Sequence, residues 1–324
     1  MESKFTAEQM KAIRDHFGMN KSIAKTYEEA LDKEYKFWNT QLVQGLRDNM
    51  SYENEPIKIK DSSEVATEPN PISSNYEWCT IDMDMDCVEV SEFLNKYYVE
   101  DITQRFRLNY SPEFLKWCLS GNEFNDLYVG IRVKSSKLLV GFISSCMVDI
   151  KINSKVVRMG EVNFLCVHPK LRGKNLAPVL IKEITRRLGL HNYFSAIYTA
   201  DRYLPRPFYS ARYYHRCLNV DVLLETGFTR LPNKTTISEM KNSLRLPSLP
   251  QNKNLKQLEE KHIVQACSLL SKYLDKYNCS KVFSLDEFRK IFYGNDFVAS
   301  YVVEVDGVVT DFVSYYKLPM TVID

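Results

Sequence analysis

The sequence has no stretch that approaches the roughly 20 consecutive apolar residues that a membrane-spanning helix requires. It also lacks an excess of one charge, because 43 lysines and arginines stand against 41 aspartates and glutamates and leave a net charge of +2. This balance implies no strong electric field for nucleic acid or a membrane surface, so any phosphate binding depends on local basic loops. The N-terminal residues MESKFTAEQM do not have the pattern of a signal peptide.

The eight cysteines form no Cys-x-x-Cys pair and no zinc-ligand spacing with the five histidines. Several of them lie inside apolar runs, as buried thiols do. This usage predicts a protein of a reducing compartment, without a disulfide framework or a bound metal. The alternating acids Asp82, Asp84 and Asp86 lack the glycine and glutamate that complete a calcium loop, and they predict a solvated turn before a helix. With 324 residues, 44% of them hydrophobic, the chain predicts a cytosolic globular protein of one large domain or two.

Residues 161–189 predict a buried strand, a basic loop and an amphipathic helix in immediate succession. The strand is the apolar run 162–167, and the loop that follows it is HPKLRGKN. In the helix, apolar residues recur along one face from Leu176 to Leu188. Pro178 fits only the first turn of such a helix, where its missing N–H costs nothing.

The two ends of this predicted helix carry different signals. At its C-terminal end, Arg186 and Arg187 suit the negative end of the helix dipole, and Gly189 is placed to be the C′ residue. At its start, the first N–H groups have no partner within the helix and point toward the loop. Gly173 lets the backbone approach a ligand closely, and Asn175 tolerates left-handed geometry. These features indicate a phosphate or pyrophosphate site, although an ordinary strand, loop and helix with solvated cations has the same pattern.

Within this stretch, RGKNLA resembles the pyrophosphate loop of the GCN5-related acyltransferases, R-G-x-G-[IL]-A, with Asn175 where glycine is usual. The longer string NFLCVHPKLRGKNLAPVLIKEITRR resembles the signature of the eukaryotic N-myristoyltransferases, the glycylpeptide N-tetradecanoyltransferases. Further segments match that family in its own order, over nearly the whole chain: YKFWNTQ (35–41), YYVED (97–101), FRLNYSPEFLKW (106–117) and ARYYHRCLN (211–219).

The resemblance implies an α/β (α+β) fold of the GCN5-related acyltransferase type with two pseudo-symmetric halves. The sequence itself repeats an order of elements: a helix, a Ser-capped helix and a hairpin occupy 88–145 and again 258–315, the second hairpin turning at Asp306-Gly307. The second copy stops just past its hairpin, so we expect this half to be incomplete and the chain to be a fragment or a truncation. The expected divisions are an N-terminal extension (1–34), a myristoyl-CoA-binding half (35–232), a crossover linker (233–256) and the start of a peptide-binding half (257–324).

By resemblance, the protein transfers a myristoyl group from myristoyl-CoA to the N-terminal glycine amine of proteins and needs no metal. It would act as a cytoplasmic monomer with transient proximity to membranes or ribosomes. Its own second residue is Glu2, so the chain is not itself a substrate of this kind. Two alternatives stay open. The family uses its C-terminal carboxylate as the base, in a segment that this sequence lacks, so the chain could bind acyl-CoA without turnover; or it could be an acetyl-CoA-dependent N-acetyltransferase.

The resemblance also assigns residues for cofactor binding and catalysis. The amides of Phe164 and Leu165, at a bulge in the strand, would form the oxyanion hole, and Asn163 and Thr199 would lie near the amine. Cys166 lies in an apolar strand without a cue for thiolate activation, so we do not expect a covalent nucleophile. The residues expected to bind the cofactor are Lys36, Phe37, Trp38, Leu165, Cys166, Val167, Arg172, Gly173, Lys174, Asn175, Leu176 and Ala177.

The peptide groove is expected at positions that match the family's motifs, with some departures. The matching residues are Tyr98, Val99, Asp101, Phe106, Arg107, Tyr213 and His215. Ile102 and Thr103 replace the acids that usually follow YVED, which puts a preference for basic peptide side chains in doubt. Asp201 stands where the family has glycine, and its carboxylate either obstructs the backbone path or serves as a substitute proton acceptor.

Overall fold

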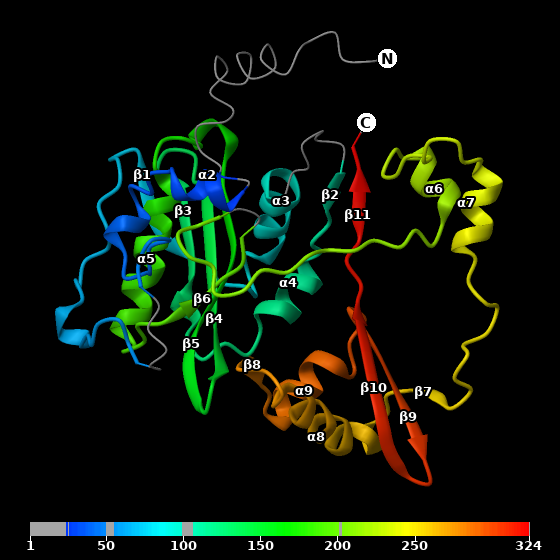
Figure 1. Cartoon of the computed structure of the whole chain (residues 1–324). Coiled ribbons are helices and arrows are strands. Elements are labelled where there is room, and N and C mark those ends of the chain that lie inside the picture. Colours follow the sequence, from blue (N-terminus) through cyan, green and yellow to red (C-terminus); the bar gives the residue numbers. More distant parts are fainter. Residues whose placement is uncertain (1–23, 25, 50–54, 99–105, 201–202, 324) are drawn as a thin grey trace. The chain divides into compact units, whose positions relative to one another are not determined.

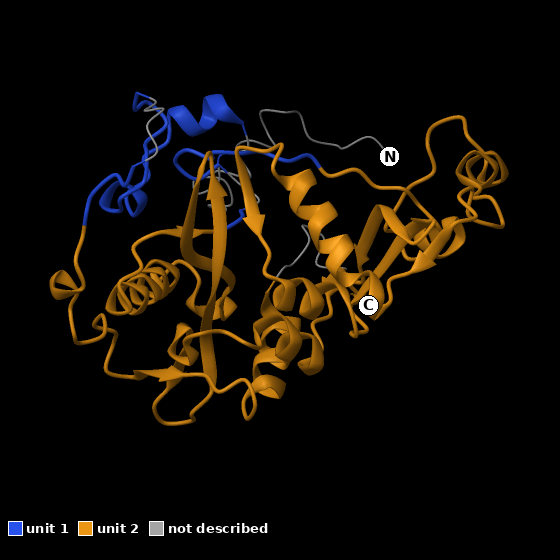
Figure 2. Ribbon diagram, turned by 90° about the horizontal axis from the view of Figure 1, so that it is seen from below, with its two compact units in different colours: residues 1–59, 198–212 blue, residues 60–197, 213–324 orange. Residues whose placement is uncertain are grey.

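The structure is a computed structural model that describes residues 24, 26–49, 55–98, 106–200 and 203–323. It divides into two compact units, shown in different colours in Figure 2. The first unit consists of residues 1–59 and 198–212, and the second of residues 60–197 and 213–324. The expected divisions at 1–34, 35–232, 233–256 and 257–324 stay predictions.

The first unit has a small aromatic core. Its elements are the short helix α2 (Tyr27–Leu31), which Thr26 caps, and the 3-10 turn η1 (Trp38–Thr40). Trp38 stacks on Tyr198 with ring centroids 5.5 Å apart. The guanidinium of Arg206 donates hydrogen bonds to the carbonyls of Asp48 and Leu46, at 2.8 and 2.9 Å. These contacts tie the segment 198–212 to the N-terminal residues of the same unit.

The second unit is built on a six-stranded sheet. Along its main path the strands follow the order β1 (Tyr76–Thr80), β3 (Tyr128–Val133), β4 (Leu139–Ile152), β5 (Lys155–Val167) and β6 (Ala196–Ile197). All these neighbours pair antiparallel except β5 and β6, which run parallel. The sixth strand, β8 (Cys279–Val282), pairs with the far end of β4. A segment of the second sequence repeat therefore belongs to the sheet of the first.

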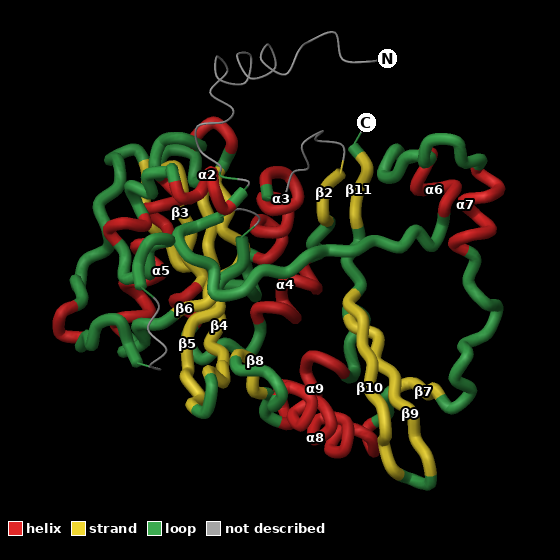
Figure 3. The backbone as a smooth tube through the Cα atoms, in the orientation of Figure 1, coloured by secondary structure: helices red, strands yellow, loops and turns green. Residues whose placement is uncertain are grey.

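Helices cover both faces of this sheet, as Figures 1 and 3 show. On one face lies α5 (Leu176–Leu190), whose Leu180, Ile184 and Leu188 pack on β3 and β4. On the other face lie α3 (Cys87–Tyr97) and α4 (Pro112–Leu119), in one core cluster with Phe142 and Phe164. The short 3-10 segments η2 (Ser62–Glu64), η3 (Asn125–Leu127) and η4 (Pro169–Leu171) connect these elements.

The remaining elements include a second core. It is built from α8 (Ile263–Leu274), α9 (Leu285–Phe292) and a sheet of β7 (Leu255–Gln257), β9 (Val298–Val305) and β10 (Val308–Tyr316), with the 3-10 turn η5 (Glu260–His262) before α8. The strand order of this sheet is β10-β9-β7, and Val302 of β9 is buried together with Ile263 of α8 and Phe288 of α9. The short helices α6 (Val220–Glu225) and α7 (Ile237–Leu244) contact each other and are not part of this core. A separate pair joins β2 (Phe106–Leu108) to β11 (Met320–Val322).

The local predictions of helix starts and turns are confirmed. The hydroxyl of Ser111 accepts a hydrogen bond from the Phe114 N–H, with Pro112 at the first position of α4. Ser284 and Glu287 form the expected capping box of α9. The second hairpin turns at Asp306-Gly307. A turn precedes α3, where the Asp82 carboxylate accepts the Asp84 N–H at 2.8 Å.

Two sequence predictions need correction. Gly189 does not end α5: it lies inside the helix, buried so close to the Val65 side chain that a Cβ would meet it at 2.9 Å, and Asn192 takes the left-handed conformation instead. The segment AIYTA (196–200) predicts a short buried strand, but the strand spans only Ala196–Ile197. The expected linker 233–256 contains α7, with a capping box of Thr236 and Glu239, and its role as the crossover stays a prediction.

Candidate functional site

Strand β5 has a bulge at Phe164 and Leu165. The pairing with β4 slips there, so that these two residues stand opposite the single residue Ile143. Phe164 is 7% exposed and has a left-handed φ of 55°, which is rare for a bulky side chain and typical of bulged strands next to sites. Ser144, on the facing strand, donates from its hydroxyl to the Asn163 carbonyl at 3.1 Å. The bulge turns backbone amides of β5 out of the regular ladder.

The hydroxyl of Tyr98 lies beside this bulge. Burial raises the pKa of Tyr98, and a hydrogen bond with the Phe164 backbone partly offsets that effect. The rings of Tyr98, Tyr110 and Phe164 contact one another: the Tyr98 centroid lies 5.9 Å from that of Tyr110 and 5.8 Å from that of Phe164, and the last two lie 5.4 Å apart. The Phe164 backbone thus faces the Tyr98 hydroxyl at the point where the pairing with β4 slips.

The loop after β5 is held in a defined shape by Arg172. Its Nε donates to the Val167 carbonyl at 3.2 Å, and its Nη2 donates to the Tyr97 carbonyl at 2.6 Å. The loop therefore bridges the end of β5 and the end of α3. Gly173 has a φ of 80°, and a Cβ placed there would meet nothing within 4 Å. Glycine is required at this position by backbone conformation and not by crowding.

Helix α5 begins directly after this loop and is left open at its start. Asn175 has a left-handed φ of 62°, and within the described part of the chain no side chain caps the helix. The Val179 N–H donates to the Asn175 carbonyl at 3.4 Å, and Pro178 has no N–H. The N–H groups of Leu176 and Ala177 remain at the mouth of the loop, where they can bind an anion.

The electrostatic environment of the loop is positive. The pKa of His168 is lowered by burial and by the nearby charges of Lys170, Lys96 and Arg172. The His168 ring also lies 4.6 Å from that of Tyr97. A basic loop with free N–H groups at a helix start is suited to a phosphate or pyrophosphate.

The second unit brings together most of the expected cofactor residues and part of the expected groove. Leu165, Cys166 and Val167 end β5, and Arg172, Gly173, Lys174, Asn175, Leu176 and Ala177 form the loop and helix start. Phe106 and Arg107 lie on β2, paired with Val322 and Thr321 of β11. The ring centroid of His215 lies 6.2 Å from that of Phe228, and the Phe228 centroid lies 5.4 Å from that of Phe106.

The other expected residues fall into three groups. Tyr213 is 88% exposed on its segment. Lys36, Phe37, Trp38 and Thr199 belong to the first unit. Val99 and Asp101, like Ile102, Thr103 and Asp201, lie outside the described residues. The sequence alone did not predict that Tyr97 neighbours the basic loop or that Phe228 neighbours Phe106 and His215. The motif YYVED contains Tyr97 and could have indicated it, whereas no motif indicates Phe228.

The bulged strand, the basic loop and the open helix start define the class of the protein as a GCN5-related acyltransferase fold. The chain belongs to the N-myristoyltransferase family: the model for "Myristoyl-CoA:protein N-myristoyltransferase, N-terminal domain" matches residues 56–211, and that for the C-terminal domain matches residues 225–324. These two matches together cover well over half of the chain.

Individual relatives agree with this assignment. The glycylpeptide N-tetradecanoyltransferase of Candida albicans is 42% identical over 304 residues, which cover 90% of this chain and 67% of that protein. The enzyme of the same name from Plasmodium falciparum is 40% identical over 308 residues, covering 93% of this chain and 75% of that protein. The crystal structure of Saccharomyces cerevisiae N-myristoyltransferase with bound myristoyl-CoA matches with a TM-score of 0.86 and 39% identity, over 90% of this chain and 72% of that one.

Proposed function

We propose that this chain transfers the myristoyl group of myristoyl-CoA to the amine of an N-terminal glycine. A C–N amide bond forms, the C–S thioester bond breaks, and CoA leaves as a thiol whose proton balances the one lost by the amine. The observation that carries the proposal is the succession of the β5 bulge, the basic loop and the open start of α5. This succession offers a donor site for a carbonyl oxygen and an anchor for a pyrophosphate a few residues apart on one chain segment.

The bulge would act on the thioester carbonyl. As the amine attacks, negative charge develops on the carbonyl oxygen, and the amides of Phe164 and Leu165 would stabilise it. Each such donor is worth about 3 kcal/mol of transition-state stabilisation. Cys166 is 3% exposed within β5, in keeping with direct transfer and not with a covalent intermediate on sulfur. Neither Asn163 nor Thr199 has a basic side chain that could remove a proton from the amine. Their role would therefore be to orient the amine.

The cofactor would be held at both chemical ends. Arg172, Gly173, Lys174, Asn175, Leu176 and Ala177 would hold the pyrophosphate, while Leu165, Cys166 and Val167 line the path toward the thioester. Lys36, Phe37 and Trp38 of the first unit would contact the CoA moiety. For the peptide, we propose a groove formed by Tyr98, Val99, Asp101, Phe106, Arg107, Tyr213 and His215.

The biological setting is also part of the proposal. The reduced cysteines and balanced charge favour a cytoplasmic monomer that acts on nascent or newly made proteins, in transient proximity to ribosomes or membranes. No helix within the described residues is long and apolar enough to cross a membrane. We further propose that the myristoyl-CoA half spans 35–232 and the peptide half begins at 257.

The test is a transfer assay with myristoyl-CoA and a short peptide that begins with glycine. We expect a peptide with the mass of one added myristoyl group and one equivalent of released CoA. The same peptide with N-terminal alanine is the acceptor control, and acetyl-CoA is the donor control. Binding of myristoyl-CoA without product would contradict the proposal in favour of an acyl-CoA-binding protein. Preferred use of acetyl-CoA would instead indicate an N-acetyltransferase.

A further inference from the structure

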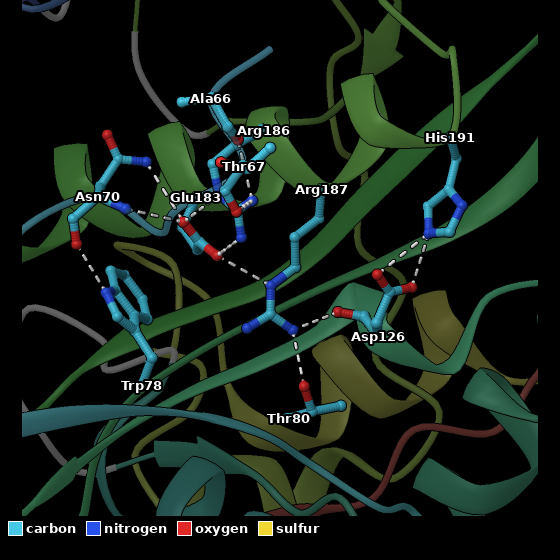
Figure 4. A network of polar contacts seen from close by, with 10 residues as sticks. All are labelled: Ala66, Thr67, Asn70, Trp78, Thr80, Asp126, Glu183, Arg186, Arg187 and His191. Carbon is cyan, nitrogen blue, oxygen red and sulfur yellow. Dashed lines mark hydrogen bonds and ion pairs between the residues drawn. The ribbon is translucent and has the colours of Figure 1, made fainter. Parts of the chain in front are cut away.

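A fully buried carboxylate lies at the middle of α5. Glu183 has 0% exposure, and Figure 4 shows it at the centre of a polar network. Its Oε1 accepts hydrogen bonds from Arg186 Nη2 at 2.7 Å and from Arg187 Nε at 3.0 Å. Its Oε2 accepts the Asn70 backbone N–H at 3.2 Å and Arg186 Nε at 3.0 Å. Burial raises the pKa of Glu183, but the bonds from Arg186, Arg187 and Asn70 outweigh it, so the carboxyl is held ionised.

On one side, this network fixes α5 to the segment that leads into β1. Arg186 Nη1 donates to the carbonyls of Ala66 and Thr67, at 3.2 and 2.9 Å. The Asn70 carbonyl in turn accepts the indole N–H of Trp78, on β1, at 2.7 Å. The helix is thereby linked to the edge strand of the sheet through directed hydrogen bonds.

On the other side, Arg187 extends the network to the sheet itself. Its Nη1 donates to Thr80 Oγ1 at 2.9 Å, at the end of β1, and to the Asp126 carbonyl at 2.5 Å, just before β3. The Asp126 carboxylate lies 2.9 and 3.0 Å from His191 Nε2, at the C-terminal cap of α5. The His191 ring stacks on Phe124 at 3.9 Å. Several independent points along the second half of α5 are therefore fixed.

The apolar face of α5 does not account for such a network. Hydrophobic contacts of Leu180, Ile184 and Leu188 hold the helix on the sheet, but they are non-directional and leave its sliding and rotation weakly defined. A buried ion pair adds little net stability compared with a well-packed apolar group. Its distinctive contribution is geometric, because hydrogen bonds are effective only within narrow limits of distance and angle.

We propose that Glu183 and Arg187 are positioning residues for acyl transfer: they fix the start of α5, and the phosphate loop with it, relative to the bulge of β5. The proposal rests on the function proposed above. Because α5 is an uninterrupted helix of 15 residues, a shift of its second half moves its first turn. The bound pyrophosphate would then shift with the helix, and the thioester would no longer reach the amides of Phe164 and Leu165. A misplacement of about 1 Å between reacting groups can lower a rate about 100-fold.

This arrangement predicts different effects on binding and on turnover. CoA without an acyl chain needs only the loop and the helix start, which move together, so its affinity should survive a shift of α5. Transfer needs the loop and the bulge in register. For Glu183→Gln, which keeps the shape and loses the charge, we expect kcat to fall about 10- to 100-fold. The Kd of CoA should change less than about threefold, since the loop itself is intact.

Two control variants separate positioning from stability and charge. Lys182→Gln removes a charge from the neighbouring exposed position of α5 and should leave kcat unchanged. Val302→Ala opens a cavity in the core of the β9 sheet, where Val302 is 1% exposed, and should lower the unfolding temperature without changing kcat per folded molecule. If Glu183→Gln does not fold, Arg187→Lys serves instead, because it keeps the charge but loses the guanidinium fork that reaches Glu183, Thr80 and Asp126.

A second measurement does not depend on turnover. A myristoyl-CoA analogue with a ¹³C-labelled ketone in place of the thioester should show its C=O stretch at lower frequency when bound to the wild type, because the bulge amides polarise it. In Glu183→Gln the stretch should return toward the free value. Unchanged kcat and an unchanged stretch in the folded variant would overturn the proposal, as would a loss of CoA affinity as large as the loss of kcat. If the wild type forms no product, the proposed function fails, and the stretch still tests the positioning.

Discussion

The starts of α5 and α9 differ in how the unpaired N–H groups of the first helical turn are treated. At α9, the Ser284 hydroxyl accepts the Glu287 N–H at 3.2 Å, and the Glu287 carboxylate accepts the Ser284 N–H at 3.0 Å. At α5, the left-handed Asn175 leaves the first turn uncapped within the described residues, and a basic loop precedes it. A missing cap typically costs about 1 kcal/mol, which a bound anion can offset. The difference is expected if α9 serves stability and α5 serves the proposed pyrophosphate.

The largest expected effect on CoA affinity comes from a carboxylate at the start of α5, where α9 already has one. Asn175→Asp places a carboxylate where we expect the pyrophosphate. Repulsion of about 2 kcal/mol, between the surface and bulk-water limits for charges about 4 Å apart, should weaken CoA binding about 30-fold. The fold should not lose stability, because a carboxylate at a helix start is favourable.

Isothermal titration with CoA and thermal unfolding measure the two effects of Asn175→Asp separately. The matched control is Asn175→Gly, which keeps the left-handed backbone and adds no charge, so CoA should bind within about threefold of the wild type. Wild-type affinity in Asn175→Asp would show that the pyrophosphate does not lie at this helix start.

The next largest effect should come from the loop backbone. Gly173→Ala imposes a Cβ on a residue with a φ of 80° in open surroundings. The left-handed conformation then costs about 1.4 kcal/mol, and CoA should bind about tenfold more weakly if it requires this loop shape.

Gly294→Ala is the matched control for Gly173→Ala. Gly294 has a φ of 71° and equally open surroundings, but it follows α9 and not the basic loop. We expect this variant to bind CoA as the wild type does. Equal losses of affinity in the two alanine variants would mean that strain anywhere in the fold, and not the loop conformation, weakens binding.

These contrasts also explain which features could be predicted from the sequence. The caps of Ser111 and Ser284, the Asp306-Gly307 turn and the loop at 172–175 depend on residues adjacent in the chain, so their chemistry is visible in the sequence. The bulge at Phe164 was expected from the family resemblance alone, since no local residue pattern demands it.

Features that depend on distant partners could not be predicted. The pairing of β8 with residues 149–152 joins segments more than a hundred residues apart and leaves no local pattern. Arg186 and Arg187 were interpreted as cations at the end of a helix, whereas their main partner is the buried Glu183. Gly189 looked like a helix terminator because the approach of Val65 is invisible in the sequence. Tertiary contacts override local propensity in each case.

The α9 side of the comparison gives a smaller effect, on stability alone. Ser284→Ala removes the cap and should lower the free energy of unfolding by about 1 kcal/mol. CoA affinity should not change, because α9 has no part in the proposed site. Chemical denaturation and calorimetry measure the two quantities. A weaker affinity for CoA in this variant would break the comparison, since it would link the capped helix to ligand binding.

The smallest expected effect is a pH dependence confined to the α5 side. Because the pKa of His168 is lowered by burial and by Lys170, Lys96 and Arg172, the folded protein holds this proton less tightly than the unfolded chain does. Stability is therefore unaffected well above the unfolded pKa of about 6.5, and it falls as the pH drops from there through the folded pKa. Below the folded pKa the loss is complete.

A bound pyrophosphate should reduce this loss, because its negative charge offsets the cations around His168 and raises its pKa toward the ordinary value. In consequence, lowering the pH from 7.5 to 5.5 should favour CoA binding more in the wild type than in His168→Gln. In that variant only the phosphates of CoA titrate over this range. Ser284→Ala, at the other helix start, should shift stability by the same amount at both pH values, because serine does not titrate there. An identical pH dependence of CoA affinity in the wild type and His168→Gln would place the anion away from His168. The open helix start could then bind the anion without this part of the basic loop.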